Sequence, residues 1–146
     1  MRIVRYDPTG GIEAITVEQA PEPTPGPGQV VIQVQATCIN PASVSALQGA
    51  PYVPGRDLAG EIVAVGEGVL DLRVGQDVLG WCQDWAAHAE LVAVPADQLV
   101  PKPAGLSWEV AGSLSTTPMA GLAGVLAVAP APGEVVVVSG PPAGSD

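Results

Sequence analysis

Three side chains able to take part in acid–base chemistry lie close together in the chain: Tyr52, Arg56 and Asp57. A tyrosine hydroxyl can donate a proton or a hydrogen bond to a substrate carbonyl. An adjacent guanidinium and carboxylate can serve as an oxyanion-binding group and a base. Two structural alternatives stay open, because neighbouring opposite charges most often form an ion pair and a half-buried tyrosine is as often structural as catalytic.

The chain contains one histidine, His88, which is the obvious candidate for a general base because imidazole titrates near neutral pH. We favour the alternative, a structural histidine whose ring nitrogens are satisfied by hydrogen bonds. The two cysteines, Cys38 and Cys82, are too few and too isolated for a disulfide framework or a structural zinc site. We therefore expect two reduced, packed thiols.

Short strands separated by turn signals must position these side chains. We expect turns at 7–11, 66–68 and 73–76, between strands at 2–6, 12–19, 29–37, 57–65, 76–80 and 86–94. A short helix is expected over 41–48, with Asn40 as its cap. Short strands at regular intervals predict a mainly β fold arranged as a small barrel.

The composition changes after residue 106. Ser107 is a suitable N-cap for a helix, and the stretch over 111–129 is rich in small residues and contains Pro118, which breaks or kinks a helix. Four consecutive valines at 135–138 predict a buried parallel strand. We therefore divide the chain into a barrel at 1–106 and a helix with a terminal strand at 107–146.

The charge and hydropathy of the chain exclude several classes of partner. Fifteen acidic residues against five Lys and Arg give a net charge of −10, which repels phosphate backbones and anionic lipid head groups. No apolar run approaches the roughly 20 residues that span a membrane, and the sequence shows no signal peptide. We expect a cytoplasmic protein that binds neither nucleic acid nor membranes.

Three motifs occur in the order typical of one enzyme superfamily. They are VPGRDLAGEIVAVG at 53–66, VGQDVLG at 74–80 and AELVAVPA at 89–96. With them the chain resembles the medium-chain dehydrogenase/reductase superfamily, and CINPAS at 38–43 resembles the Asn-Pro loop of its zinc-independent quinone oxidoreductase and enoyl reductase branch. The resemblance implies a GroES-like, partly open barrel, the substrate-side domain, followed by a helix and strand from the junction with the Rossmann domain.

The resemblance also bears on cofactors. Zinc-dependent members carry a cysteine where this chain has Asn40 and a His-Glu pair where it has Arg56 and Asp57. Neither an amide nor a guanidinium binds zinc as Cys and His do, so we expect no metal. The glycine turn that holds the nucleotide in family members resembles 140–146, where Pro141 and Pro142 have no N–H to donate. We therefore predict no cofactor on this chain.

The resemblance places a group of side chains along the family's substrate cleft. We assign catalysis to Tyr52, Arg56 and Asp57, and substrate binding to Asn40, Ser43, Trp81 and Trp85. Two tryptophans on one loop predict a largely apolar small-molecule ligand. The alternative is that both indoles fill a surface that a further domain covers in family members.

Three functions are compatible with these features. The first, which we favour, is a non-redox conversion such as cyclisation or isomerisation of an apolar molecule in secondary metabolism, since orientation alone can accelerate such reactions. The second is the substrate-domain subunit of a split NADPH-dependent quinone or enoyl oxidoreductase, with the Rossmann domain on a separate chain. The third is a binding or scaffold protein without catalysis. The valines at 135–138 further predict a homodimer through residues 107–139.

Overall fold

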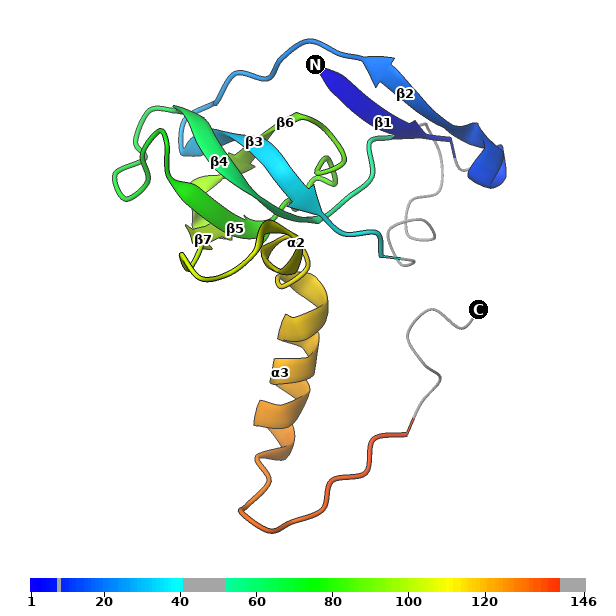
Figure 1. Ribbon diagram of the computed structural model, residues 1–146, viewed down its shortest axis with the longest axis vertical. Coiled ribbons are helices and arrows are strands. Elements are labelled where there is room, and N and C mark those ends of the chain that lie inside the picture. Colours follow the sequence, from blue (N-terminus) through cyan, green and yellow to red (C-terminus); the bar gives the residue numbers. More distant parts are fainter. Residues whose placement is uncertain (8, 41–51, 140–146) are drawn as a thin grey trace.

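The computed structural model describes residues 1–7, 9–40 and 52–139 (Figure 1). Its strands are β1 (Arg2–Tyr6), β2 (Ile15–Gln19), β3 (Gln29–Thr37), β4 (Asp57–Val65), β5 (Asp77–Trp81), β6 (Leu91–Pro95) and β7 (Leu99–Pro101). The helices are η1 (Gly11–Ala14), η2 (Ala96–Gln98), α2 (Trp108–Ala111) and α3 (Thr116–Val128). The helix expected over 41–48, which includes Ser43, lies outside the described residues.

Two antiparallel sheets form the body of the molecule. Five strands pair in the order β6-β3-β4-β5-β7, and β1 pairs with β2 in a separate ribbon. Isolated bridges between Ile3 and Ala89 and between Tyr6 and Tyr52 attach this ribbon to the rest. Within the described residues the outer strands β6 and β7 do not pair with each other, so the barrel is partly open. This confirms the mainly β, GroES-like fold.

The core lies against the two central strands, β3 and β4. Their registers place Val30 opposite Val65 and Ile32 opposite Ile62, and Ile32 and Ile62 are fully buried with Leu58. Both strands have the bounds predicted from the sequence, because their Val, Ile and Leu side chains favour a pleated sheet. In each strand a run of consecutive residues is buried, so both faces of the sheet are covered there.

Several predicted boundaries were wrong in ways that have a local cause. The strand predicted at 12–19 begins only at Ile15, because Gly11–Ala14 form a turn of 3₁₀ helix. The strand predicted at 86–94 begins at Leu91, after a loop in which Trp85 has a left-handed φ of 55°. The short strand β7 was not predicted, and three residues give too little periodicity to detect.

The helical region after residue 106 is divided before Pro118 rather than at it. Ser107 caps α2, and its Oγ accepts a hydrogen bond from the Val110 N–H. Gly112 then ends this helix against β3, where a Cβ would lie 2.7 Å from the carbonyl carbon of Ala36. Pro118 falls in the first turn of α3, a position where its missing N–H costs little.

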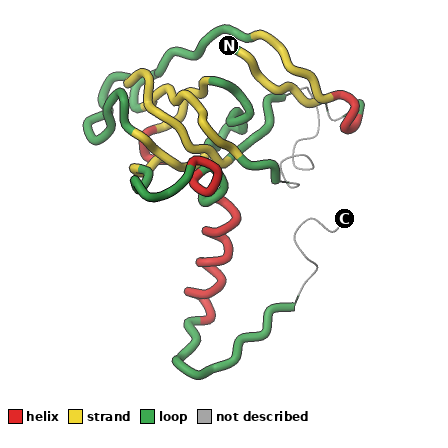
Figure 2. The backbone as a smooth tube through the Cα atoms, in the orientation of Figure 1, coloured by secondary structure: helices red, strands yellow, loops and turns green. Residues whose placement is uncertain are grey.

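The strand predicted at 135–138 is not formed, which is the largest correction to the fold. These four valines run as irregular chain, and their exposed fractions lie between 47% and 92%. A strand needs a neighbour to accept and donate its backbone hydrogen bonds, and no described strand lies beside this segment. Helix α3 also extends away from both sheets and has no buried residue (Figure 2). No described helix is long and apolar enough to cross a bilayer.

We predict that Gly60→Ala lowers the free energy of unfolding by about 1–3 kcal/mol, because overpacking a close contact has costs of this size. A Cβ at this β4 position would lie 2.2 Å from the Gln33 carbonyl oxygen, which belongs to the backbone of β3. Urea denaturation monitored by tryptophan fluorescence measures the change. Gly105→Ala is the control, because nothing lies within 4 Å of a Cβ there, and equal stability of both variants would contradict the prediction.

Candidate functional site

The Asp57 carboxylate, at the first residue of β4, connects three parts of the chain. It is 1% exposed. Its Oδ1 accepts from the backbone N–H of Thr116 at 2.6 Å, and its Oδ2 accepts from the Thr116 hydroxyl at 2.5 Å and from the Cys38 thiol at 3.0 Å. The carboxylate therefore fastens the first residue of α3 to the end of β3, and it satisfies an N–H that the helix itself leaves unpaired.

Arg56 and Asp57 do not form the structural ion pair that we weighed from the sequence. Consecutive residues in an extended chain point to opposite sides, and the Arg56 guanidinium lies instead between two indole rings. Its Cζ is 4.9 Å from the ring centroid of Trp81 and 5.3 Å from that of Trp85. Among the described residues it forms no ion pair, and its buried Nε has no hydrogen-bond partner.

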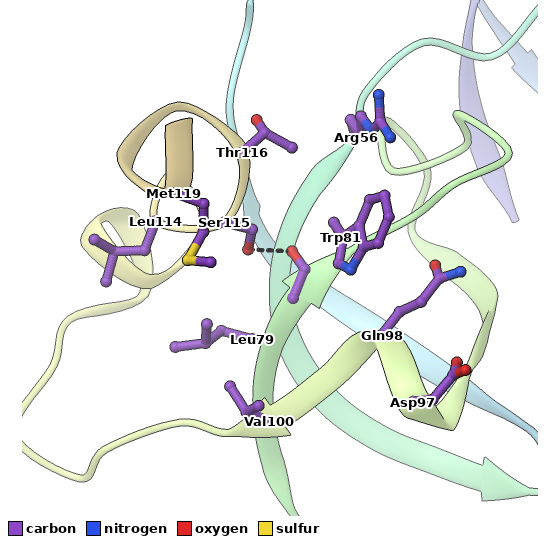
Figure 3. A pocket seen from close by; sticks show the side chains of 11 residues that line it. Arg56, Leu79, Trp81, Asp97, Gln98, Val100, Leu114, Ser115, Thr116 and Met119 are labelled. Carbon is purple, nitrogen blue, oxygen red and sulfur yellow. Dashed lines mark hydrogen bonds between the residues drawn. The ribbon is translucent and has the colours of Figure 1, made fainter. Parts of the chain in front are cut away.

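A cavity of about 580 Å³ lies between the β5–β7 edge of the sheet and the start of α3 (Figure 3). Its apolar wall consists of Leu79, Trp81, Val100, Leu114 and Met119, and its polar lining of Arg56, Asp97, Gln98, Ser115 and Thr116. The Ser115 hydroxyl donates to the Gly80 carbonyl at 2.5 Å, which holds the helix side of the cavity against β5. The volume is typical of sites for small organic molecules.

The predicted site residues are divided between this cavity and other places. Arg56 and Trp81 line the cavity, and the Trp85 ring lies 5.3 Å from the Arg56 guanidinium. Asp57 does not line the cavity, and its carboxylate accepts a hydrogen bond from the Thr116 hydroxyl. The Asn40 amide lies 3.5 Å from the Thr117 hydroxyl, at the start of α3. Ser43 lies outside the described residues.

Tyr52 is placed with the β1–β2 ribbon and does not line the cavity beside Arg56. Its backbone exchanges hydrogen bonds of 2.9 and 3.0 Å with Tyr6, and the two rings meet edge to face at 5.6 Å. Burial, and to a lesser degree the neighbouring Tyr6, raises the pKa of Tyr52. Its catalytic role remains a prediction that this placement does not favour.

His88 has the structural surroundings that we favoured from the sequence. Its ring Nε2 lies 3.1 Å from the carbonyl oxygen of Cys38, and its backbone N–H donates to Pro54 at 2.9 Å. It does not line the cavity beside Arg56.

The sequence reasoning missed the side of the cavity that α3 supplies. Ser115 and Thr116 belong to a run of hydroxyl residues before an apolar helical stretch, which is a recognised helix-start pattern. That pattern could have located the helix start. Leu114 and Met119 gave no such signal, because only the tertiary fold brings them opposite Leu79 and Val100.

The donor set of this region does not fit a zinc ion. The described residues contain no group of three or more His, Cys, Asp or Glu side chains able to hold a metal. The thiol nearest to the carboxylate is also kept protonated: burial, and then the hydrogen bond to Asp57 and its charge, raise the pKa of Cys38 to about 12. The described residues therefore do not bring together a set of zinc ligands.

We predict that Asp57→Asn lowers the free energy of unfolding by about 2–3 kcal/mol, because an amide cannot accept all three of the hydrogen bonds that the charged group accepts. Chemical denaturation measures this loss. Asp71→Asn, in an exposed turn, is the matched control and should change stability by less than about 0.5 kcal/mol. If both variants are as stable as the parent chain, Asp57 does not fasten α3 to the sheet.

We also predict that iodoacetamide modifies Cys38 slowly in the native chain below pH 9. The raised pKa keeps the folded thiol neutral there, so the rate should increase only as the pH approaches 12, whereas an unperturbed thiol titrates near 9.0. Peptide mass spectrometry separates Cys38 from the buried Cys82. Equal rates in the native and urea-unfolded chains at pH 8 would contradict the assignment, and Asp57→Asn should accelerate the native reaction.

The comparisons with known proteins agree with this fold and its location in an enzyme superfamily. The family described as "Alcohol dehydrogenase GroES-like domain" matches residues 26–104. The synaptic vesicle membrane protein VAT-1 homolog of Rattus norvegicus is 35% identical over 114 residues, which cover 72% of this chain and 28% of that protein. The quinone oxidoreductase of Mus musculus is 30% identical over 122 residues, which cover 78% of this chain and 37% of that protein.

Solved structures show the same fold. An alcohol dehydrogenase superfamily protein from Novosphingobium aromaticivorans has a TM-score of 0.72 at 32% identity, covering 80% of this chain and 38% of that one. The quinone oxidoreductase from Coxiella burnetii has a TM-score of 0.79 at 23% identity, covering 87% and 44%. This chain thus spans less than half the length of these relatives. Its motifs, its partly open barrel and the match over residues 26–104 together show that it belongs to the alcohol dehydrogenase GroES-like domain family, within the medium-chain dehydrogenase/reductase superfamily.

Proposed function

We propose that this chain is the substrate-side domain of a zinc-independent quinone or enoyl reductase, and that a nucleotide-binding domain packs on α3. The observation that carries the proposal is an uncovered apolar helix that begins at the wall of a ligand-sized cavity. The names of several relatives, including quinone oxidoreductases and trans-enoyl reductases, support the reaction class.

Helix α3 has no polar face after its first turn. It contains no charged residue, and its five large apolar side chains are 50–68% exposed: Met119, Leu122, Val125, Leu126 and Val128. A helix that is apolar on every side is normally enclosed by other protein. The sheets cover none of these side chains, so a partner must contact α3 from more than one side.

The cavity lies at the start of α3, so a partner domain on this helix would lie beside the proposed substrate site. Ser115, Thr116 and Met119 contribute both to the start of α3 and to the cavity lining. A domain that packs on the helix would therefore lie next to the cavity and limit the access of water to it. NADPH bound to such a domain would supply the hydride for reduction.

The lining of the cavity offers few groups that would hold a nucleotide. Arg56 is the one cationic side chain lining the cavity, and Asp97 lines it as well. Residues 140–146, which resemble the family's glycine turn, lie outside the described part. The absence of intrinsic NADPH binding therefore stays a prediction, and the proposal assigns the nucleotide to the partner domain.

The other functions predicted from the sequence remain open to the same experiment. A non-redox conversion would use the cavity without a nucleotide, and a scaffold would use neither. A homodimer through residues 107–139 would cover the apolar helix with a second copy. The described strand positions do not support pairing through 135–138, because no strand is formed there.

We predict that the purified chain alone does not oxidise NADPH with phenanthrenequinone, and that adding the separately produced Rossmann domain of the Mus musculus quinone oxidoreductase gives quinone-dependent oxidation. Leu126→Asp should reduce this activity and the association at least tenfold, because it puts a charge on the apolar helix. Val17→Asp, equally exposed but on β2, is the control. Light scattering of the chain alone measures self-association through the same surface.

Two results would contradict the proposal. The first is Leu126→Asp behaving like Val17→Asp in both association and activity. The second is turnover of an apolar metabolite by the chain alone without NADPH consumption, which would favour the non-redox conversion.

A further inference from the structure

We propose that the cavity beside Arg56 binds apolar molecules that carry a single carboxylate, and that Arg56 is the residue that recognises this group. The inference deepens the proposed function, on which it rests for the view that this domain faces the substrate. It names a further ligand class for the same cavity, unsaturated or aromatic carboxylic acids.

Two indole rings pack against the guanidinium of Arg56, and no described residue forms a hydrogen bond or ion pair with it. Trp81 and Trp85 lie against it at 4.9 and 5.3 Å, so side-chain packing restricts its position. Its Nε is buried without a hydrogen bond, and among the described residues it joins no ion pair. By contrast, Arg2 and Arg5 pair with Glu90 and Glu18 at 2.6 and 2.7 Å. Buried donors in native proteins normally have a partner, so an unpaired one at a cavity wall points to a ligand.

The missing partner cannot be explained by a shortage of acidic residues. The chain has fifteen Asp and Glu residues, and the adjacent Asp57 is turned away to Thr116 and Cys38. The contacts with the two indoles are cation–π contacts at 4.9 and 5.3 Å, and they do not use the N–H groups of the guanidinium as hydrogen-bond donors. A carboxylate matches a guanidinium with two parallel hydrogen bonds and also neutralises the charge, whereas a neutral carbonyl leaves the charge uncompensated.

The rest of the cavity selects an apolar molecule. Leu114 and Met119 lie on the helix side of the hollow, and Leu79 and Val100 lie on the sheet side together with Trp81 (Figure 3). Asp97 is the other charged residue of the lining, and its carboxylate would repel a second acidic group on the ligand. The net charge of −10 acts in the same direction against phosphates. The ligand that fits this lining is therefore an apolar molecule with one carboxylate, which Arg56 would bind while the apolar side chains contact the rest.

The test compares trans-cinnamate with cinnamamide, which has the same shape but no charge. Calorimetry on the full chain, without nucleotide or partner domain, should give at least tenfold tighter binding of cinnamate. Arg56→Gln should remove this preference by weakening cinnamate at least tenfold while leaving cinnamamide unchanged. Arg73→Gln, in an exposed turn, changes the net charge equally and should keep the preference.

Four outcomes would overturn the inference. The first two are equal affinity for cinnamate and cinnamamide, and no binding of either compound at millimolar concentration. The third is a loss of cinnamate affinity in Arg73→Gln as large as that in Arg56→Gln. The fourth is displacement of cinnamate by inorganic phosphate or NADPH at comparable concentration. Arg56→Lys keeps the charge and should retain part of the preference, which gives a reading even if Arg56→Gln does not fold. This test measures ligand binding and no reductase activity. Failure to bind cinnamate would therefore leave the proposed reductase function standing, and failure of the reductase assay would leave the binding result unchanged.

Discussion

The buried carboxylate of Asp57 is the interaction on which the arrangement of this molecule depends. It binds both the backbone and the hydroxyl of Thr116, and so determines where α3 leaves the sheet. The hydrogen bond from Ser115 to Gly80 is a second attachment at the same place. Helix α3 has no buried residue, so no packed apolar face holds it against the sheet. The polar contacts at its first turn attach it instead. The cavity exists because these contacts hold the helix start opposite β5 and β7.

Two adjacent residues divide structural and ligand-facing roles because of strand geometry. Asp57 points inward to Thr116 and Cys38, and Arg56 points to the indoles and the cavity. A family position that carries zinc ligands in metal-dependent members is used here for anchoring and, in our proposal, for anion recognition. Burial, and then the hydrogen bond to the same carboxylate and its charge, raise the pKa of Cys38. One buried carboxylate thus orders the junction and contributes to keeping the nearby thiol protonated.

The sequence allowed the bounds of β3 and β4 to be predicted, because runs of Val, Ile and Leu favour strands. The family resemblance placed Arg56, Trp81 and Trp85 along one cleft, and the structure brings the guanidinium close to both indoles. The valines at 135–138 misled the prediction, since an apolar run reports that a segment seeks burial but not which chain provides the neighbouring strands. Leu114 and Met119 could not be predicted as cavity residues, because their position depends on the angle at which α3 leaves the sheet. The pairing of Tyr52 with Tyr6 could not be predicted for a similar reason, because it is a long-range contact.

Native-state hydrogen exchange at the Thr116 amide tests the central claim most directly, because this N–H is bonded to the Asp57 carboxylate. NMR should show it exchanging at least about tenfold more slowly than the amide of the exposed Thr117, as expected for a hydrogen bond inside a cooperative unit. The protection should decrease in Asp57→Asn, whose amide oxygen can accept fewer of these hydrogen bonds, while the amides of β3 and β4 stay protected. Equally fast exchange at Thr116 and Thr117 in the parent chain would show that Asp57 does not hold α3 in place.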